Sequence, residues 1–445
     1  MAGEVAHELD EQSWLYRPSF PDEWKRMSLL SMARWVNGLA FRDFQFSDTG
    51  KPVIKIAEIK GGITGQTKFT IQTFEESVFV TNGDMLFTWS GQPETSIDVF
   101  WWRGRDGWLN QHIFKVTPIE DLDPVFFFYV LRYLKPNFIG IARNKQTTGL
   151  GHVTRRDIEN IEAAFPPLAE QKAIAAVLGA LDDKIGLNRR MNATLEAMAR
   201  ALFQSWFVDF DPVRAKLDGR PPAALDPATA ALFPDSFQDS EAGHIPKGWT
   251  IQPVGEVADC VGGGTPSTAE PKYWEGGTHH WTTPKDFSSL QSPILLDTNR
   301  KLTDAGIANI SSGLLPAGTL LLSSRAPVGY LAISAIPVAI NQGFIALKCN
   351  ERASNLFMLN WCQTNMADIE SRATGTTFAE ISKQNFRPIP VVLPPKELMA
   401  AFSAKVAPHY AQITANLQQS RTLATLRDTL LPKLLSGEIT TTPTS

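Results

Sequence analysis

Several hallmarks of secreted, membrane and metal-binding proteins are missing from this chain. It has three cysteines in 445 residues, Cys260, Cys349 and Cys362. An odd and widely spaced set argues against a disulfide framework or a zinc site and favours reduced thiols in a cytosolic protein. There is no long apolar run and residues 1–10 are acidic, so we expect neither a membrane span nor a signal peptide but a cytoplasmic location.

A surplus of basic residues is also missing, since the formal net charge is -4. Proteins that bind nucleic acids usually carry an excess of Lys and Arg on the contacting face. The acidic excess lies in two segments, 1–20 and 209–244, whereas segments 21–165 and 245–392 are balanced. Each balanced segment therefore has enough charge for one basic and one acidic face.

Catalytic motifs are the third absence. The sequence has no GxxxxGK[ST] phosphate loop and no Asn-Pro-Pro-Tyr adenine-methyltransferase motif. Glu23-Trp24-Lys25 and Glu58-Ile59-Lys60 match the end of a nuclease motif, but residues 248–250, the counterpart of the first, carry neither charge. We take both as chance matches. His279-His280 is a poor metal pair, because adjacent residues on a strand point to opposite faces.

What the chain does contain is an internal repeat, visible as short patterns that occur in the same order in both halves. The pairs are residues 21–24 with 246–249, Asn110-Gln111 with Asn341-Gln342, Thr148-Gly149 with Thr374-Gly375, and Pro166-Pro167 with Pro394-Pro395. Each copy is a mixed segment followed by a long helical stretch, which predicts an α+β fold with two tandem domains and two long helices.

The expected boundaries follow from the repeat. They are a first domain at 1–165, a helix at 166–208, a linker at 209–244, a second domain at 245–392, a second helix at 393–439 and a tail at 440–445. The linker is rich in Pro and Asp, a composition that opposes regular structure. Strand-like runs at 53–56 and 318–322 and helical patterns at 124–134 and 354–365 make each domain α+β.

The two helical stretches carry a coiled-coil seam, in which apolar or small residues alternate at spacings of four and three. The seam consists of Ile174, Leu178, Leu181, Ile185, Asn188, Leu195 and Leu202 in the first helix, and Val406, Ile413, Asn416, Leu423 and Leu430 in the second. Asn188 and Asn416 occupy corresponding positions, and a buried seam Asn fixes helix register. The alternative is that both face solvent.

The helix from Glu170 to Phe207 has no Pro, and at about 1.5 Å per residue it extends roughly 57 Å. That exceeds the ~34–36 Å between successive major-groove faces on one side of a duplex. Two readers at the ends of such a rod would contact one DNA molecule more than one turn apart. We therefore expect a bipartite target with an unread gap.

The residues in and around these helices resemble the specificity subunits of type I restriction-modification enzymes. The resemblance rests on five stretches that together with the repeat span nearly the whole chain: 167–174, 181–185, 202–210, 245–249 and 430–439. It implies two target recognition domains, each reading half of an asymmetric split DNA site, and conserved helices that pack antiparallel.

The same resemblance assigns the chemistry to partner chains. Two methyltransferase subunits would dock on this chain and methylate adenine N6 with S-adenosylmethionine, and restriction subunits using ATP and magnesium would cleave DNA. Two departures stand out. The second helix begins Pro394-Pro395-Lys396-Glu397-Leu398, without the Gln that follows Glu170, and the first domain lacks a counterpart of the glycine turn at 262–266.

DNA contacts require side chains that pair with base edges or phosphates, namely Arg, Lys, Asn, Gln, Ser and Thr. The loops at 143–152 and 372–377 have this composition; the alternative is that they are solvated glycine loops. The predicted DNA-binding residues are Lys60, Arg143, Lys145, Gln146, Thr147, Thr148, His152, Lys285, Arg325, Arg372, Thr374, Thr376 and Thr377. The aromatic run at 100–102 is predicted to be core rather than a base-stacking surface.

Two functions remain from the sequence. The leading hypothesis is a non-catalytic DNA-specificity subunit without a cofactor or metal of its own, and the alternative is a self-contained DNA enzyme with an unrecognised active site. Inserting four residues in the helix between Asn188 and Leu195 is expected to change the tolerated gap and leave both half-sites intact.

Overall fold

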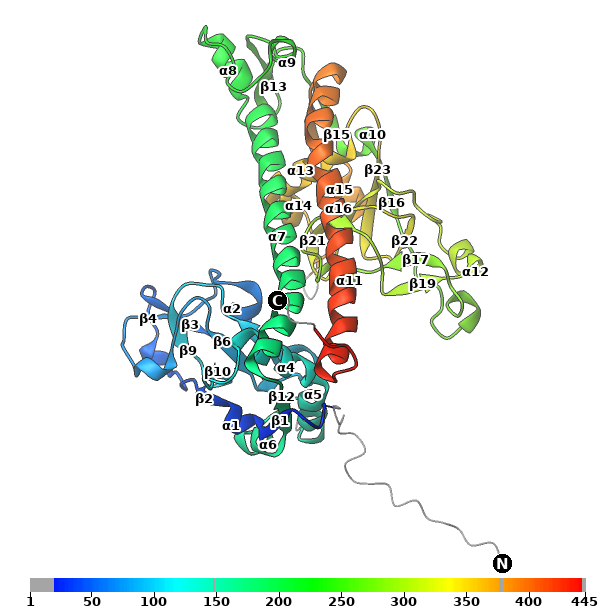
Figure 1. Ribbon diagram of the computed structural model, residues 1–445. Coiled ribbons are helices and arrows are strands. Elements are labelled where there is room, and N and C mark those ends of the chain that lie inside the picture. Colours follow the sequence, from blue (N-terminus) through cyan, green and yellow to red (C-terminus); the bar gives the residue numbers. More distant parts are fainter. Residues whose placement is uncertain (1–19, 147–148, 376–378, 442–445) are drawn as a thin grey trace, which may run out of the picture. The chain divides into compact units, whose positions relative to one another are not determined.

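The computed structural model describes residues 20–146, 149–375 and 379–441 and divides into two compact units. Unit 1 comprises residues 1–184 and 423–445, and unit 2 comprises residues 185–422. Two long helices, α7 (Leu168–Phe207) and α16 (Lys396–Leu435), contribute residues to both units. Both helices were predicted from the seam, and both are confirmed (Figure 1).

Unit 1 is built around an antiparallel four-stranded sheet in the order β2-β10-β6-β8. Its strands are β1 (Lys25–Ser28), β2 (Ala33–Asn37), β3 (Lys51–Ile54), β4 (Phe69–Thr70), β5 (Phe79–Val80), β6 (Met85–Thr88), β7 (Ser90–Gly91), β8 (Asp98–Trp101), β9 (Gly107–Leu109), β10 (Ile113–Pro118), β11 (Gly151–His152) and β12 (Glu162–Phe165). Its shorter helices are α1 (Leu29–Met32), α2 (Ile56–Gly61), α3 (Pro93–Ser96), α4 (Pro124–Tyr133), α5 (Lys135–Asn144) and α6 (Arg155–Asn160).

Unit 2 contains the corresponding elements. Its strands are β13 (Phe237–Ser240), β14 (Gly243–Pro246), β15 (Thr250–Pro253), β16 (Ala258–Gly262), β17 (His279–Thr282), β18 (Ile294–Leu295), β19 (Arg300–Leu302), β20 (Leu320–Ser324), β21 (Val328–Ser334), β22 (Val338–Ile340), β23 (Phe344–Cys349) and β24 (Pro390–Leu393). Its shorter helices are α8 (Asp211–Leu217), α9 (Pro227–Ala231), α10 (Val254–Val257), α11 (Pro284–Phe287), α12 (Asp304–Ala308), α13 (Asn355–Thr364), α14 (Met366–Ser371) and α15 (Lys383–Phe386).

The predicted repeat is confirmed by strand order. The order β2-β10-β6-β8 in unit 1 matches β16-β23-β20-β21 in unit 2, where β18 adds a fifth strand. The smaller sheets also match, because β3 pairs parallel with β9 and antiparallel with β4, as β17 does with β22 and β19. The outer pairs β1·β12 and β15·β24 are equivalent too. The two halves therefore share one topology.

Local sequence explains where the paired helices of each domain begin. Asp123 accepts hydrogen bonds from the backbone N–H groups of Val125 and Phe126 at the start of α4, and Ser354 caps α13 in the same way. Both helices then bury aromatic side chains against their sheet. In unit 1 the core centres on Trp35, whose ring lies 5.7 Å from that of Phe87.

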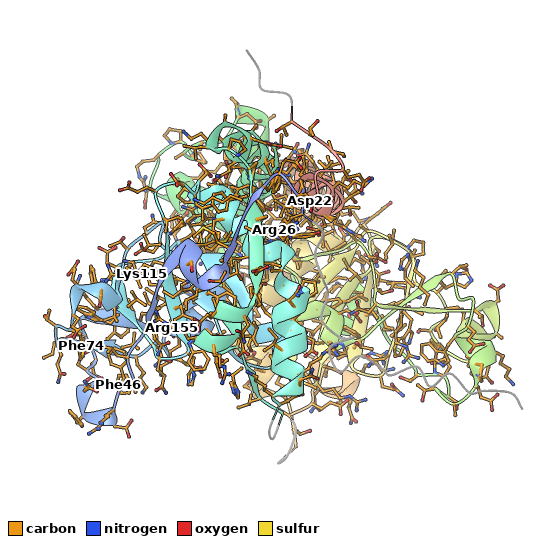
Figure 2. The ribbon with its side chains drawn as sticks, turned by 60° about the horizontal axis from the view of Figure 1, so that its bottom comes forward. Asp22, Arg26, Phe46, Phe74, Lys115 and Arg155 are labelled. Carbon is orange, nitrogen blue, oxygen red and sulfur yellow. The ribbon has the colours of Figure 1, made fainter. Side chains whose placement is uncertain are left out.

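Unit 1 has a second, smaller aromatic cluster beneath the sheet β4-β3-β9-β5. The ring of Phe74 lies 5.3 Å from that of Trp108, and Phe41 packs between Phe46 and Phe74. Figure 2 shows Phe46 and Phe74 at one end of the unit, apart from Asp22. The domain thus has two hydrophobic centres.

Two expectations about local structure are wrong. Segment 209–244 is not irregular, since it forms α8, α9 and the hairpin β13–β14. Pro212 and Pro227 lie in the first turns of α8 and α9, where the missing N–H group costs little, and Asp226 caps α9. The strand-like run at 53–56 ends at Ile54, because α2 begins at Ile56.

No helix among the described residues is both long and apolar enough to cross a membrane.

Glu196, on the part of α7 that lies in unit 2, provides a test of packing in that unit. Burial raises the pKa of its carboxyl, against a hydrogen bond with Ser292 and the nearby Arg200. One carboxyl oxygen, Oε1, has no hydrogen-bond partner among the described residues. Because the folded pKa lies above the ordinary value of 4.5, this group contributes stability below pH 4.5 that is lost as pH rises through the raised value.

We therefore expect Glu196→Gln to raise the unfolding temperature at pH 7, where the wild-type carboxylate is charged, and to flatten the pH dependence above pH 4.5. Thermal unfolding followed by circular dichroism at several pH values measures both. The matched control is Glu351→Gln, which neutralises an exposed carboxylate of the same unit. Equal melting temperatures for wild type and Glu196→Gln at pH 7 would contradict the prediction.

Candidate nucleic-acid interface

The polar candidates gather where one end of the main sheet meets its connecting loops. In an antiparallel sheet the end of one strand lies beside the start of the next, so the ends of β2 and β6 meet the starts of β10 and β8. We call the segments 37–39, 89–92, 110–112 and 149–153 the loop end of unit 1. Backbone hydrogen bonds join them: Gln111 N to Leu39 O, Trp89 N to His112 O and Val153 N to Trp89 O, at 2.8–3.2 Å.

The loop end of unit 2 has the same construction. It consists of segments 263–265, 324–327, 341–343 and 379–381, in which Gly264 N bonds to Ile340 O, Ser324 N to Gly343 O and Ile381 N to Ser324 O at 2.8–3.0 Å. The duplicated sheet therefore presents the same set of loops twice in the chain, once in each unit.

The glycine turn at 262–266 has a structural counterpart, so the expectation that the first domain lacks one is wrong in part. A Cβ on Gly263 would lie 1.9 Å from Ile340 O, and a Cβ on Gly38 would lie 2.2 Å from Asn110 O. Both glycines directly follow equivalent strands and allow the backbone to approach the carbonyls of the repeated Asn and of the residue before it. Gly38 was not recognised from the sequence because the residues around it differ from those around Gly263.

Three of the predicted residues of unit 1 contact the loop between β6 and β8. Lys60 donates to Thr95 O, and burial lowers the pKa of its ammonium against the pull of Asp98. Arg143 Nε lies 2.5 Å from Glu94 Oε1, and His152 pairs with Ser90 between β11 and β7. All three residues therefore contact the segment that connects β6 to β8.

The other two described candidates of unit 1 contact residues that follow them closely in the chain. Lys145 Nζ lies 2.5 Å from Asp157 Oδ1. Burial acts to raise the pKa of Asp157, but its hydrogen bonds with Lys145 and Thr154 lower it. Gln146 Nε2 donates to Gly149 O at 2.7 Å. Thr147 and Thr148 lie outside the described residues.

In unit 2 the structure brings together Arg325 and Thr374, which both bridge to Glu380 through the backbone. Arg372 instead lies at the end of α14 and pairs with Asp368 at 3.1 Å. Lys285 is exposed on α11, which follows β17. Thr376 and Thr377 lie outside the described residues.

Several polar side chains of the loop ends were missed as candidates. Asn37 accepts from Trp89 Nε1 at 2.9 Å, Gln111 lies 3.3 Å from the ring of His112, and Gln342 Oε1 accepts from Thr265 at 2.6 Å. The Asn-Gln pair was visible in the sequence, but only as a marker of the repeat. The pair could have been recognised as a candidate for DNA contact, because it recurs beside a turn and Gln is suited to pairing with adenine.

A basic pair at the start of α6 was missed as well. Arg155 and Arg156 are exposed and directly follow the loop end of unit 1; Arg155 is labelled in Figure 2. Thr154 and Asp157 form a capping box that begins the helix there. The equivalent position in unit 2, the first residue of α15, is the exposed Lys383.

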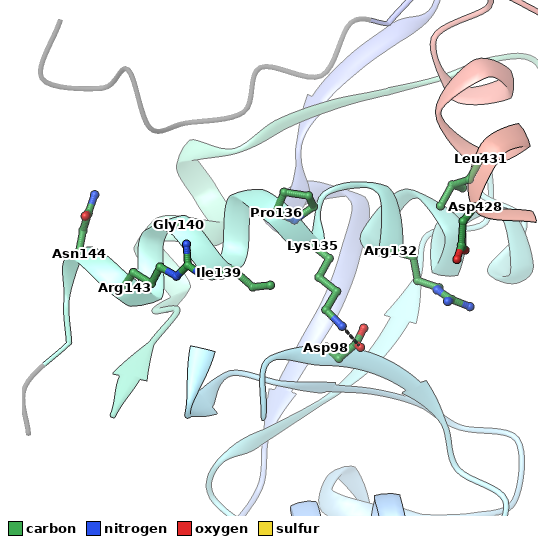
Figure 3. Close-up of a pocket in the computed structure, with 10 residues that line it drawn as sticks. All are labelled: Asp98, Arg132, Lys135, Pro136, Ile139, Gly140, Arg143, Asn144, Asp428 and Leu431. Atoms are coloured by element: carbon green, nitrogen blue, oxygen red, sulfur yellow. Dashed lines mark hydrogen bonds and ion pairs between the residues drawn. The ribbon is translucent and has the colours of Figure 1, made fainter. Parts of the chain in front are cut away.

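A cavity of about 520 Å³ lies beside α5 in unit 1. Among the residues that line it, Figure 3 shows Lys135 and Asp98 pointing toward one another as an ion pair, and Arg143 and Asn144 at the far end of α5. Arg132, which also lines the cavity, pairs with Asp182 at 3.2 Å. Because these cations already face carboxylates, the cavity lacks the uncompensated charge that an anion site needs.

The seam residues lie at or near the helix contact. Asn188 is fully buried, and its Nδ2 donates to Gln419 Oε1 at 2.9 Å and Ser420 Oγ at 3.1 Å. Asn416 Nδ2 donates to Asn192 Oδ1 at 2.8 Å. The alternative that both asparagines face solvent is therefore wrong. Within unit 2, the pairing of Asn192 with Asn416 and of Phe203 with Phe402 makes the two helix segments antiparallel.

The apolar seam residues fall into two groups by burial. Ile174, Leu178, Ile185, Val406 and Ile413 are buried, whereas Leu181, Leu195, Leu202, Leu423 and Leu430 are partly buried.

Gln171, the residue absent from the second helix, has a structural role. It is buried, accepts from Asp123 N at 2.8 Å and donates to Asp121 O and Pro166 O, both at 2.9 Å. It therefore ties α7 to the loop before α4 in its own unit. The corresponding residue of α16, Met399, is buried in an apolar core instead.

Three further sequence interpretations concern residues away from the loop ends. The core assignment of the aromatic run is confirmed, since Trp102 is buried and Trp101 stacks on Phe128 at 5.2 Å. His279 lies 2.7 Å from Asp304, and His280 lies 3.3 Å from Asp297. The cysteines are free thiols on β16, β23 and α13, and burial raises the pKa of Cys260 to about 11.

Comparison with known proteins gives this arrangement a family. The model of the type I restriction modification DNA specificity domain matches residues 21–197 and 246–406. The HindI specificity subunit of Haemophilus influenzae is 26% identical over 67% of this chain and 73% of its own length. The putative MjaX specificity subunit of Methanocaldococcus jannaschii is 22% identical over 94% of each chain.

A solved structure shares the fold. The crystal structure of a type I restriction-modification S subunit from M. genitalium matches with a TM-score of 0.52 at 16% identity, over 94% of this chain and 99% of that one. The two family matches fall one on each repeat and together cover more than half of the residues. The chain therefore belongs to the type I restriction-modification DNA specificity family.

Proposed function

We propose that each loop end reads one half of a bipartite DNA site, and that this chain directs methyltransferase subunits to that site without a catalytic centre of its own. The observation that carries the proposal is the duplicated loop end, in which the same segments meet in both units with different polar side chains. A shared topology gives both halves the same way of docking, and different side chains give each half its own bases.

The proposed partners follow from the family. Double-stranded DNA contacts the loop ends, and two methyltransferase subunits bind S-adenosylmethionine and modify adenine. Restriction subunits use ATP and magnesium. The long helices set the gap between half-sites and dock the methyltransferase subunits. The polar layer at Asn188 and Asn416 supports this role, because a sliding helix pair would leave buried amides unpaired.

The catalytic part of the proposal has a direct test. The purified chain, incubated with DNA and either S-adenosylmethionine or magnesium, is expected to modify and cut nothing, and adenine methylation is expected once methyltransferase subunits are added. Turnover by the chain alone would favour the alternative of a self-contained DNA enzyme.

The half-site assignment is tested by a matched pair of variants. Gln111→Ala and Gln342→Ala remove equivalent side chains of the two loop ends. Each is expected to weaken binding of the native site by about 1–3 kcal/mol and to relax base choice in one half-site, a different half for each variant. Sequencing of methylated adenines from cells expressing each complex measures this. If both variants altered the same half, the assignment of one unit to one half-site would fail.

A further inference from the structure

In unit 1 an ion pair joins the last turn of α5 to the segment between β6 and β8. Arg143 lies in the last turn of α5, at the start of segment 143–152; we call this segment, and segment 372–380 of unit 2, the Thr-Gly loop. Glu94 lies in the loop between β6 and β8, which we call the hairpin loop. The distance from Arg143 Nε to Glu94 Oε1 is 2.5 Å, and both side chains are at least half exposed. The hydrogen bond from Arg143 lowers the pKa of Glu94, so the pair stays charged at neutral pH.

Unit 2 has an ion pair between the same two loops with the charges exchanged. Arg325 lies in the hairpin loop between β20 and β21, and Glu380 lies at the end of the Thr-Gly loop. Arg325 Nη1 is 3.5 Å from Glu380 Oε2, and the two residues also form a backbone bridge. Since the cation comes from opposite loops in the two units, the pairs are not copies inherited at one aligned position.

Each pair places a carboxylate on an arginine that DNA phosphate would otherwise contact. An exposed ion pair holds its partners by a factor of only about 1.4 to 5. A phosphate offers an arginine two charge-assisted hydrogen bonds, so it can displace the carboxylate. The displaced carboxylate then stays near the DNA backbone, where like charges repel. A non-cognate duplex is held by phosphate contacts and therefore meets this cost, whereas a correct half-site is held by base contacts that do not depend on these arginines.

We propose that Glu94 and Glu380 are specificity-determining residues, which occupy Arg143 and Arg325 in the unbound chain and so lower affinity for non-cognate DNA. The proposal rests on the proposed function of the loop ends in reading DNA. It extends that function by assigning to two acidic side chains the rejection of wrong sequences, a role that attractive contacts do not perform.

The test uses the full chain with Glu94→Gln, Glu380→Gln and both together, each titrated with a random-sequence duplex over a range of salt concentrations. Each single variant is expected to bind the random duplex about two- to five-fold more tightly. The plot of log affinity against log salt is expected to steepen by about 0.9 for each arginine released to a phosphate. Affinity for the native site, identified by methylation mapping, is expected to change less, so discrimination falls.

Matched controls separate this role from general charge. Glu120 and Glu351 are exposed and follow β10 and β23, at the opposite end of these strands from the loop end. Glu120→Gln and Glu351→Gln are expected to leave the salt slope unchanged. In the presence of Arg143→Gln, the Glu94→Gln change is expected to lose its effect, since no arginine is left to release.

Two results would overturn the inference and are distinguishable. If the wild-type complex binds its mapped site while Glu94→Gln and Glu380→Gln match wild type on the random duplex and in salt slope, the role of the carboxylates is refuted and the proposed function stands. If the wild-type complex shows no preference for the mapped site over the random duplex, the proposed function fails, and the inference fails with it.

Discussion

Four residues inserted after Asn192 in α7, together with four inserted before Asn416 in α16, are expected to lengthen the unread gap by about one base pair and leave both half-sites unchanged. Four helical residues rotate by about 40° beyond one full turn. One base pair rotates by about 34–36°, as 10–10.5 base pairs make a turn. Since each reader must keep facing a groove, we expect this match in rotation to set the new gap.

The insertion has to be made in both helices because their polar layer is paired. Asn416 donates to Asn192, and Asn188 donates to Gln419 and Ser420. A change in one helix alone, as the sequence suggested, would leave these buried amides without partners and is expected to impair folding.

Methylated adenines mapped in cells that express the altered complex report the gap and both half-sites at once. The control is an insertion of the same four residues after Gly219, between α8 and α9 and outside both long helices. It is expected to leave the gap as it was. An unchanged gap in the double insertion, or a change in either half-site, would refute the role of the helices as a spacer.

Replacing Asp182 with Ala is expected to destabilise unit 1 by about 2–4 kcal/mol, because three buried or half-buried groups would lose one shared acceptor. Asp182 Oδ2 accepts from Tyr129 at 2.8 Å and Arg132 at 3.2 Å, and its Oδ1 accepts from Arg427. Burial and this carboxylate raise the pKa of Tyr129. Only 12% of the Arg427 side chain is exposed, so its charge would remain poorly solvated.

The adjacent residue provides the control. Asp183 is exposed, and Asp183→Ala removes the same charge one position along α7. Urea unfolding followed by tryptophan fluorescence is suitable, with the transitions of the two units fitted separately because a chain of two units is not expected to unfold in one step. Asp182→Asn is expected to be intermediate, since an amide still accepts from Tyr129. Equal stability of Asp182→Ala and Asp183→Ala would show that the network contributes little.

The equivalent contact in unit 2 uses different side chains, although the two units share one topology. The residue of α13 that corresponds to Tyr129 is Asn360, and it lies 3.4 Å from the hydroxyl of Tyr410 on α16. At this position unit 1 therefore joins its domain to a long helix through an ionic network, and unit 2 does so through neutral groups. Both contacts pair a polar side chain of the domain with one on a long helix, although Asn360 Oδ1 has no hydrogen-bond partner among the described residues.

Much of the fold was predictable because it depends on short-range patterns. The seam predicted both long helices to within a few residues, since spacing along one helix face is a local property. The order of the repeated motifs predicted a duplicated topology, because each motif marks the same strand end in both copies. Asn188 and Asn416 were recognised on the same ground, as polar residues within an apolar stripe.

The interface was less predictable because it is assembled from segments distant in the sequence. Residue type and loop composition placed Arg143 and Arg325 among the candidates, but only the folded sheet brings them to Glu94 and Glu380. The folded sheet also makes Gly38 equivalent to Gly263, because at both positions the backbone has to pass close to a carbonyl group from a distant segment of the chain. The sequence by itself determined the duplicated helices and domains through local periodicity. Only the tertiary structure decided which polar groups meet, because those contacts depend on how antiparallel strands align their ends.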